Sequence, residues 1–221
     1  MSLALVLDLD DTLYPERAYN FSGFRAVGRH LAAQRGISGF ADCCVALFES
    51  GERGDIFDQA LARLGVTADV AELLTVYREH APEITLFEDA RTLFERVRGK
   101  LPLALLTDGY AAVQRRKVAA LGIADHFAAP VFSDDEGREA WKPSPLPYLR
   151  VMNLLAQKAE EFIYVGDNPA KDFVTARKLG WQTVWVCRPG AVHQVEAVAP
   201  GFEADIVIES LTGLPWHRYG L

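Results

Sequence analysis

Short apolar runs and helical patterns alternate along most of the chain. Apolar runs that are bounded by turn residues predict buried strands. They occupy residues 3–7, 101–106, 130–132, 162–165, 181–186 and 206–208. Helical patterns lie between most of these runs, at residues 89–98, 111–121, 146–156 and 170–179. This alternation predicts an α/β fold, namely a Rossmann-like doubly wound parallel sheet with helices on both faces.

The stretch between the first strand and residue 86 follows a different pattern. Hydrophobic residues recur there at helical spacing from Phe21 to Tyr77, and no convincing strand interrupts them. We therefore predict two domains: an α/β core made of residues 1–15 and 86–221, and an inserted α-helical domain at residues 16–85. The aromatic residues of the insertion are most simply the core of a small helical bundle.

The composition narrows the classes of partner. Half of the 221 residues are hydrophobic, which suits one substantial core with a smaller appended domain. The net charge of -7 and the scattered Lys and Arg argue against nucleic acid or an acidic membrane surface as a partner. No apolar run approaches the roughly 20 residues of a membrane span, and the first apolar stretch is too short for a secretory signal. The three cysteines show neither metal-ligand spacing nor a disulfide framework, so we expect free thiols and a cytoplasmic protein.

Polar clusters follow the predicted strands, at the edge of a parallel sheet where ligands bind. Asp8 and Asp10 close the first strand and, because side chains alternate along a strand, they start out on the same side of it. Like charges this close are stable only if a cation, a shared proton or hydrogen bonds offset their repulsion. On this stretch alone, a surface turn with Asp11 or Thr12 as a helix cap is an alternative. The later clusters contain Thr107-Asp108-Gly109, Lys142, and Asp167 with Asp172.

Together these residue types favour a site that handles phosphate. Three or more carboxylates around a hard cation make an oxygen-ligand Mg²⁺ site, which also binds substrate phosphates. Lys142 would offset the acidic charge and bind the phosphate as a point charge. The hydroxyl of Thr107 and the N–H groups around Gly109, at a predicted helix N-terminus, suit phosphate oxygens.

The same residues resemble the four motifs of the haloacid dehalogenase-like (HAD) superfamily, in its phosphatase branch. Asp8-Leu-Asp10-Asp11-Thr12 is similar to the first motif, DxDxT. Thr107 is similar to the second motif, which is usually Thr or Ser followed by Asn-Gly, and Lys142-Pro143 to the third. Residues 166–172, Gly-Asp-Asn-Pro-Ala-Lys-Asp, are similar to the fourth, GDxxxxD. The resemblance covers essentially the whole chain, and it implies that the helical insertion is a type 1 cap that closes over the site and selects the substrate.

The resemblance also implies roles for the acids of the first and fourth motifs. Asp8 would attack phosphorus and become an aspartyl phosphate. Asp10 would protonate the leaving oxygen and then activate the water that hydrolyses the intermediate. Mg²⁺ would be held by Asp8, by the main-chain carbonyl of Asp10 and by Asp167. Thr12 would support these ligands without binding the metal itself.

The remaining residues would hold the phosphoryl group. Thr107 and Lys142 would bind it directly, with Asp108 and Gly109 forming the turn beside Thr107, and Lys142 would help to keep the nucleophile ionised. Asp172 would orient Lys142 or a metal-bound water. Asp108 departs from the usual Asn, so its carboxylate either points away from the ligand or alters the leaving-group pocket.

A Mg²⁺-dependent phosphatase acting on a small phosphorylated metabolite is therefore the leading hypothesis, with a sugar phosphate, phosphoglycolate or a nucleotide as its substrate. A phosphomutase of the β-phosphoglucomutase type would use the same core and cap. A 2-haloacid dehalogenase shares the fold and the nucleophile but needs neither Mg²⁺ nor an acid at position 10. A non-catalytic binding protein on this scaffold would be expected to have lost Asp8 or Asp167. The sequence predicts neither the oligomeric state nor the cap residues that select the substrate.

Overall fold

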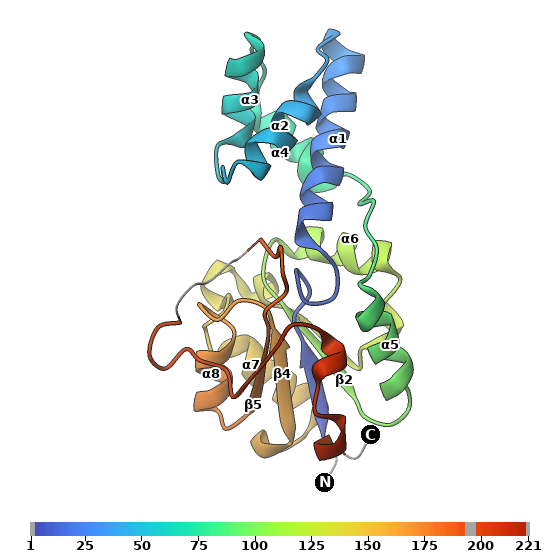
Figure 1. The fold of residues 1–221 in the computed structure, drawn as a ribbon, viewed down its shortest axis with the longest axis vertical. Helices are drawn as coiled ribbons and strands as arrows, with labels where there is room; N and C mark the ends of the chain where they lie inside the picture. Colours follow the sequence, from blue (N-terminus) through green and yellow to red (C-terminus); the bar gives the residue numbers. More distant parts are fainter. Residues whose placement is uncertain (1–2, 193–197, 220–221) are drawn as a thin grey trace. The chain divides into compact units, whose positions relative to one another are not determined.

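The computed structural model describes residues 3–192 and 198–219, and the chain divides into two compact units (Figure 1). The first, which we name the core unit, comprises Met1–Glu16 and Thr85–Leu221. The second, which we name the helical unit, comprises Arg17–Ile84. All three cysteines are free, as predicted. Within the described ranges, the chain forms no helix with the length and hydrophobicity needed to cross a membrane.

The core unit contains the predicted parallel sheet. Its six strands lie in the order β3-β2-β1-β4-β5-β6, and every neighbouring pair is parallel. The strands are β1 (Ala4–Leu7), β2 (Leu103–Thr107), β3 (Ala129–Phe132), β4 (Phe162–Gly166), β5 (Gln182–Val186) and β6 (Ile206–Ile208). The fold class predicted from the sequence is confirmed, with strand ends shifted by one or two residues.

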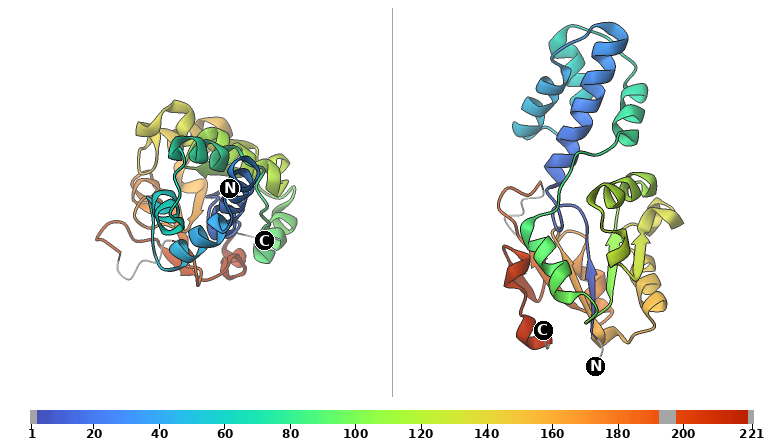
Figure 2. Two further views of the ribbon diagram at one scale, coloured as in Figure 1. Left: turned by 90° about the horizontal axis from the view of Figure 1, so that it is seen from above. Right: turned by 90° about the vertical axis from the view of Figure 1, so that its right-hand side faces the viewer.

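Helices between the strands cover both faces of the sheet. Tyr148 and Phe173 belong to the buried cluster on the face that carries Val6. Because side chains alternate along a strand, Leu5 and Leu7 point to the opposite face, and both are buried. Figure 2 shows α5 and α7 on opposite sides of the sheet. The helices are α5 (Glu88–Val97), α6 (Ala111–Leu121), α7 (Leu146–Leu155) and α8 (Phe173–Lys178).

The carboxyl ends of the three central strands carry polar residues identified from the sequence. Asp8 follows β1, Thr107 ends β2, and Asp167 follows β4. The backbone N–H of Asp8 still donates to the carbonyl of Val165 at 2.9 Å, so the sheet hydrogen bonding continues to the first acid. The sheet therefore fixes the main chain of three polar clusters at one edge.

The helical unit contains helices and no strand between residues 17 and 84, all of which the structure describes. Phe24 packs against the rings of Phe48, Phe57 and Tyr77 at centroid distances of 6.2, 6.1 and 6.0 Å. These four rings line a cavity of about 250 Å³ inside the unit. The aromatic residues therefore form a bundle core, as their helical spacing indicates. The helices are α1 (Glu16–Arg35), α2 (Phe40–Glu49), α3 (Ile56–Leu64) and α4 (Val70–Glu79).

A buried ion pair between Asp89 and Arg188 joins α5 to the segment after β5. Arg188 Nη1 lies 2.8 Å from Asp89 Oδ2, and Nη2 lies 3.0 Å from Oδ1. Both side chains are only 10% exposed. Ser210 Oγ and the N–H of Leu211 also donate to Asp89 Oδ2. Burial raises the pKa of Asp89, but these hydrogen bonds outweigh burial and hold the pKa below its usual range.

We expect Asp89→Asn to lower the free energy of unfolding at pH 7 by about 2–4 kcal/mol, because the Arg188 charge loses its partner. The pKa of Asp89 is lowered in the folded protein. Its contribution to stability is therefore present above the unfolded pKa of about 3.9 and is lost as the pH falls below that value. Urea unfolding of wild type and variant at several pH values measures both effects.

Asp135→Asn is the matched control for this prediction. Asp135 makes a similar two-point pair with Arg115, at 2.9 and 2.8 Å, but at the surface. Exposed pairs contribute little, so we expect a loss below about 1 kcal/mol. Equal losses for the two variants at pH 7 would show that the pair on α5 is not stabilised by its burial and added donors.

Candidate active site

Asp8 lies at the centre of a cluster of charged residues at the carboxyl edge of the sheet. Because β1 lies between β2 and β4, Asp8 is flanked by the loops that follow these two strands. The loop after β2 carries Asp108, and the loop after β4 carries Asp167 and Asp172. All four acids are buried, so each requires a compensating group.

The buried ammonium of Lys142 joins two of these acids. Its Nζ lies 2.8 Å from Asp8 Oδ1 and 2.8 Å from Asp172 Oδ1, and it donates to the Tyr164 hydroxyl at 2.9 Å. Burial lowers the pKa of Lys142, but Asp172 and Asp8 outweigh burial and hold the pKa well above its usual value. Burial raises the pKa of Asp8 to about 6, Lys142 opposes this rise, and Asp172 adds to it. Lys142 therefore remains charged and favours the ionised form of Asp8.

Asp172 is held by three donors. Its Oδ1 accepts from Lys142 and from the Tyr164 hydroxyl, the latter at 3.3 Å, and its Oδ2 accepts the N–H of Asn168 at 2.9 Å. The bond to Asn168 closes a turn, so the helix that the sequence pattern predicts from residue 170 begins only after Asp172. These contacts suit the orienting role toward Lys142 that the resemblance implies.

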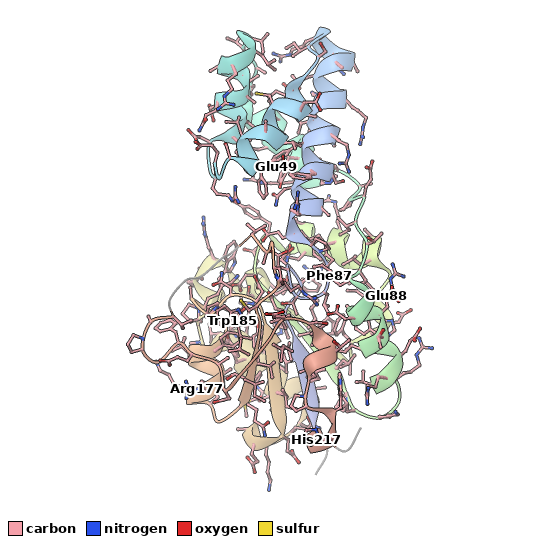
Figure 3. The ribbon with its side chains drawn as sticks, in the orientation of Figure 1. Glu49, Phe87, Glu88, Arg177, Trp185 and His217 are labelled. Atoms are coloured by element: carbon pink, nitrogen blue, oxygen red, sulfur yellow. The ribbon has the colours of Figure 1, made fainter. Side chains whose placement is uncertain are left out.

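The loop after β4 depends on two further residues. A Cβ atom on Gly166 would lie 2.5 Å from Asp172 Oδ2, so a larger residue would displace that carboxylate. Trp185 of β5, labelled in Figure 3, donates its indole N–H to the carbonyl of Asp167 at 2.8 Å. Gly166 thus leaves room for the Asp172 carboxylate, and Trp185 fixes the main chain of Asp167.

Carboxylate oxygens of Asp8, Asp167 and Asp172 lie within 4.8 Å of one another. Lys142 contacts two of these three acids, Asp8 and Asp172, whereas the ion pair that Lys171 makes is with Asp108. Asp167 Oδ2 is buried and accepts no hydrogen bond from the residues that the structure describes. Burial, Asp8 and Asp172 raise the pKa of Asp167 well above its usual value.

This donor set fits a hard divalent cation such as Mg²⁺. An oxygen-rich cluster with excess negative charge and an unbonded buried oxygen is stabilised by such an ion. Because both oxygens of Asp172 already accept hydrogen bonds, Asp8 and Asp167 are the candidate carboxylate ligands. The arrangement supports the predicted ligand set without fixing its geometry.

Asp10 is held by residues that sequence analysis missed. Its Oδ1 accepts from Lys117 Nζ at 2.7 Å and from the Tyr14 hydroxyl, and its Oδ2 accepts from Gln114 Nε2 at 2.8 Å. Burial raises the pKa of Asp10, but Lys117, Tyr14 and Gln114 outweigh burial and lower it below the usual value. Gln114 and Lys117 are three positions apart on α6, so they share a helix face. The three-residue spacing of Gln114 and Lys117 is the sequence feature that could have indicated their shared role. Polar residues on solvent-exposed helix faces have the same spacing, so the feature is not specific.

The turn after β2 is tied to the same helix. Gln114 Nε2 also donates to Thr107 Oγ1, at 2.6 Å. Gly109 has a φ of +111°, which glycine adopts without strain, and it lets the chain turn into α6. The N–H of Ala111, at the start of α6, donates to Asp134 Oδ2 at 3.0 Å. Part of the helix N-terminus that we expected to face phosphate is therefore bound by a protein carboxylate.

The carboxylate of Asp108 faces protein donors. Its Oδ1 accepts from Ser133 Oγ at 2.7 Å and from the N–H of Lys142 at 3.1 Å. Its Oδ2 accepts from Lys171 Nζ at 3.2 Å. Burial raises the pKa of Asp108, but the two lysines and the hydrogen bonds lower it below the usual value. The acid that replaces the usual Asn is therefore ionised and bound on both oxygens.

The alternative interpretation of the first acidic stretch is correct only in part. Asp11 Oδ1 accepts the N–H of Glu16, the first residue of α1, at 2.8 Å, which is a capping contact, but Asp11 is buried and does not lie in a surface turn. Asp8 and Asp10 belong instead to the charged cluster. Thr12 is buried, and its Oγ1 has no hydrogen-bond partner among residues 3–192 and 198–219.

Comparison with known proteins identifies the family. A family model of the haloacid dehalogenase-like hydrolases matches residues 3–180. The chain is 33% identical over 138 residues to phosphoserine phosphatase from Thermus thermophilus, which covers 62% of this chain and 55% of the relative. It is 28% identical over 222 residues to glyceraldehyde 3-phosphate phosphatase from Methanopyrus kandleri, covering 93% and 94% of the two chains. The crystal structure of the HAD-hydrolase YfnB from Bacillus subtilis bound to magnesium superposes with a TM-score of 0.71 at 21% identity, covering 100% of this chain and 99% of that one.

The chain therefore belongs to the haloacid dehalogenase-like hydrolases, and the family predicted from the sequence is confirmed. It spans about half the length of the first curated relatives that it matches: 55% of the Thermus phosphoserine phosphatase and 50% of N-acylneuraminate-9-phosphatase from Homo sapiens. At 21% identity, the Bacillus structure supports the fold alone.

We expect the metal-free protein to lose stability as the pH rises. The folded pKa of Asp8 is raised to about 6, so its contribution is present below the unfolded pKa of about 3.9 and is lost as the pH rises through 6. In excess chelator at pH 8, Asp8→Asn should therefore raise the free energy of unfolding by about 2 kcal/mol. Urea unfolding at pH 5 and pH 8 measures this difference.

Asp167→Asn should also stabilise the chelated protein, because it removes a buried charge whose oxygen lacks a donor among the described residues. Mg²⁺ should raise the melting temperature of the wild type but not that of this variant. Asp125→Asn, an exposed acid of the core unit, is the control and should respond to Mg²⁺ as the wild type does. A Mg²⁺ response that survives Asp167→Asn would rule out Asp167 as a ligand.

Proposed function

We propose that this protein is a Mg²⁺-dependent phosphatase that hydrolyses a small phosphorylated metabolite through an aspartyl phosphate on Asp8. One observation carries the proposal: the buried Asp8 carboxylate contacts the buried Lys142 ammonium and lies within 4.8 Å of the Asp167 carboxylate, whose Oδ2 accepts no hydrogen bond from the described residues. A carboxylate nucleophile beside a fixed cation and a cation site suits phosphoryl transfer. The relatives named as phosphatases of phosphoserine and glyceraldehyde 3-phosphate support a small phosphomonoester.

In the first step Asp8 attacks phosphorus. Because its Oδ1 is bound to Lys142, its other carboxylate oxygen is the one offered to the phosphoryl group. Lys142 and the Thr107 hydroxyl bind phosphoryl oxygens, the first by charge and the second by a hydrogen bond. Mg²⁺, held by Asp8, Asp167 and the main-chain carbonyl of Asp10, would neutralise charge on the transferred group.

Asp10 moves the protons in both steps. Asp10 must first take up a proton from solvent, because it gives one to the leaving oxygen; once ionised, it takes a proton from the water that hydrolyses the aspartyl phosphate. The donors Lys117, Tyr14 and Gln114 favour its ionised form, which is the form that the second step requires. Their contacts also hold the carboxylate in one position, as efficient proton transfer demands.

We assign the helical unit as the type 1 cap that selects the substrate, and we place the protein in the cytoplasm, where free cysteines persist. A phosphomutase would use the same residues but would return the phosphoryl group to a second position of the substrate. A 2-haloacid dehalogenase needs no acid at position 10, so the donors around Asp10 would have no role in it. The relatives named as phosphatases favour the phosphatase over the mutase.

The test is phosphate release from a panel of phosphomonoesters, with Mg²⁺ and with excess chelator. The panel contains phosphoserine, glyceraldehyde 3-phosphate, phosphoglycolate, sugar phosphates and nucleoside monophosphates. We expect release that requires Mg²⁺ and that falls by about 10³-fold or more in Asp8→Asn, because the nucleophile is lost. Asp125→Asn should retain wild-type rates.

Three results would contradict the proposal. Release that persists in Asp8→Asn would exclude an aspartyl phosphate on that residue. Isomerised product without free phosphate would identify a phosphomutase, and chloride release from a 2-haloacid would identify a dehalogenase.

A further inference from the structure

An ion pair crosses the end of the strand that leads to Asp8. Lys171, in the loop after β4, places its Nζ 3.2 Å from Asp108 Oδ2, in the loop after β2. β1 lies between β2 and β4 in the sheet, so a contact between these two loops spans the end of β1. Asp108 directly follows Thr107, and Lys171 lies between Asp167 and Asp172 in the chain, so the ion pair joins two of the loops that carry the candidate site.

Asp108 is built to hold this ammonium. Its side chain is 5% exposed, and its second oxygen is fixed by Ser133 Oγ and by the N–H of Lys142. An Asn at this position would offer a neutral amide oxygen, which attracts an ammonium far less strongly than a carboxylate does. The replacement of the usual Asn by Asp therefore gives position 108 the charge needed to anchor a lysine from the loop after β4.

The two lysines of the cluster differ in access. The Lys142 side chain is 0% exposed and lies between Asp8 and Asp172, whereas the Lys171 side chain is 31% exposed. An incoming anion can therefore contact Lys171 without unpacking the core. A phosphomonoester carries up to two negative charges, so a second ammonium at this edge would add to its binding.

We propose that Lys171 is a second phosphate-binding cation of this site and that Asp108 is the positioning residue that holds its ammonium at the end of β1. The inference rests on the proposed function, because it names a further group for the same phosphoryl site. Phosphate oxygens share the ammonium with Asp108, whose contacts to Ser133 and Lys142 keep the carboxylate in place.

The test is the affinity for inorganic phosphate, measured by isothermal titration calorimetry with Mg²⁺ present, together with kcat and KM on the best substrate of the panel. We expect Lys171→Met to weaken phosphate binding by about 10- to 100-fold, the range for losing a hydrogen bond to a charged group. Lys171→Arg keeps the charge and should restore most of this affinity. The loss should appear mainly in KM, because the ammonium binds the ground state as well as the transition state.

Asp108→Asn tests the anchoring role. It should weaken phosphate binding by about 3- to 10-fold in the wild-type background and should have no further effect in Lys171→Met, because the two residues act as one unit. Lys178→Met, which removes an exposed lysine of α8, is the matched control and should bind phosphate as the wild type does. Circular dichroism establishes that each variant is folded.

The outcomes separate this inference from the proposed function. If the wild type releases phosphate but Lys171→Met binds phosphate within about twofold of the wild type, the Lys171 assignment is wrong and the phosphatase stands. If Asp108→Asn weakens binding equally in both backgrounds, Asp108 does not act through Lys171. If the wild type releases no phosphate yet binds it through Lys171, the proposed phosphatase activity is wrong and the phosphate-binding role of Lys171 is supported. A wild type that neither binds nor releases phosphate overturns both.

Discussion

The contact between the Lys142 ammonium and two aspartates is the interaction on which the rest of the site depends. The Lys142 side chain is completely buried and lies between Asp8 and Asp172. In a medium of low dielectric constant, two carboxylates so close together would repel each other strongly without it. The ammonium permits the first acid to be ionised at the end of a buried strand, and the second acid keeps the ammonium in place. A reactive carboxylate is thus obtained from an arrangement that is also stable.

Most of the remaining buried acids are also compensated by protein donors, which come from different parts of the core unit. Side chains of α6 bind Asp10, and the loop after β3 contributes Ser133 to Asp108. Asp167 is the exception, since its Oδ2 has no donor within the described ranges. The sheet therefore supplies main-chain positions, whereas helices and loops supply charge. The carboxylate charge that these donors do not compensate lies at Asp167, where a cation would bind.

The strand pattern predicted most of this geometry. Apolar runs that end in acids placed Asp8, Thr107 and Asp167 at one sheet edge, because parallel strands end together. The partners Gln114, Lys117 and Lys171 were not predicted, since polar residues on helix faces and in loops are ordinary and only tertiary packing brings them to the acids. The late start of α8 was missed for a related reason: the side chain of Asp172 bonds backward to the main chain, and helical spacing carries no sign of that bond.

The central position of β1 has a consequence for how the chain acquires its structure. Residues 4–7 pair with residues 103–105 on one side and with residues 162–165 on the other. A ribosome must therefore release well over half of the chain before the first strand gains both neighbours, and such long-range pairing is slow. Until then its apolar residues lack a sheet to join. The segment that ends in the candidate nucleophile is thus made before both of the strands that enclose it, and it becomes a central strand only after residues 162–165 have been made.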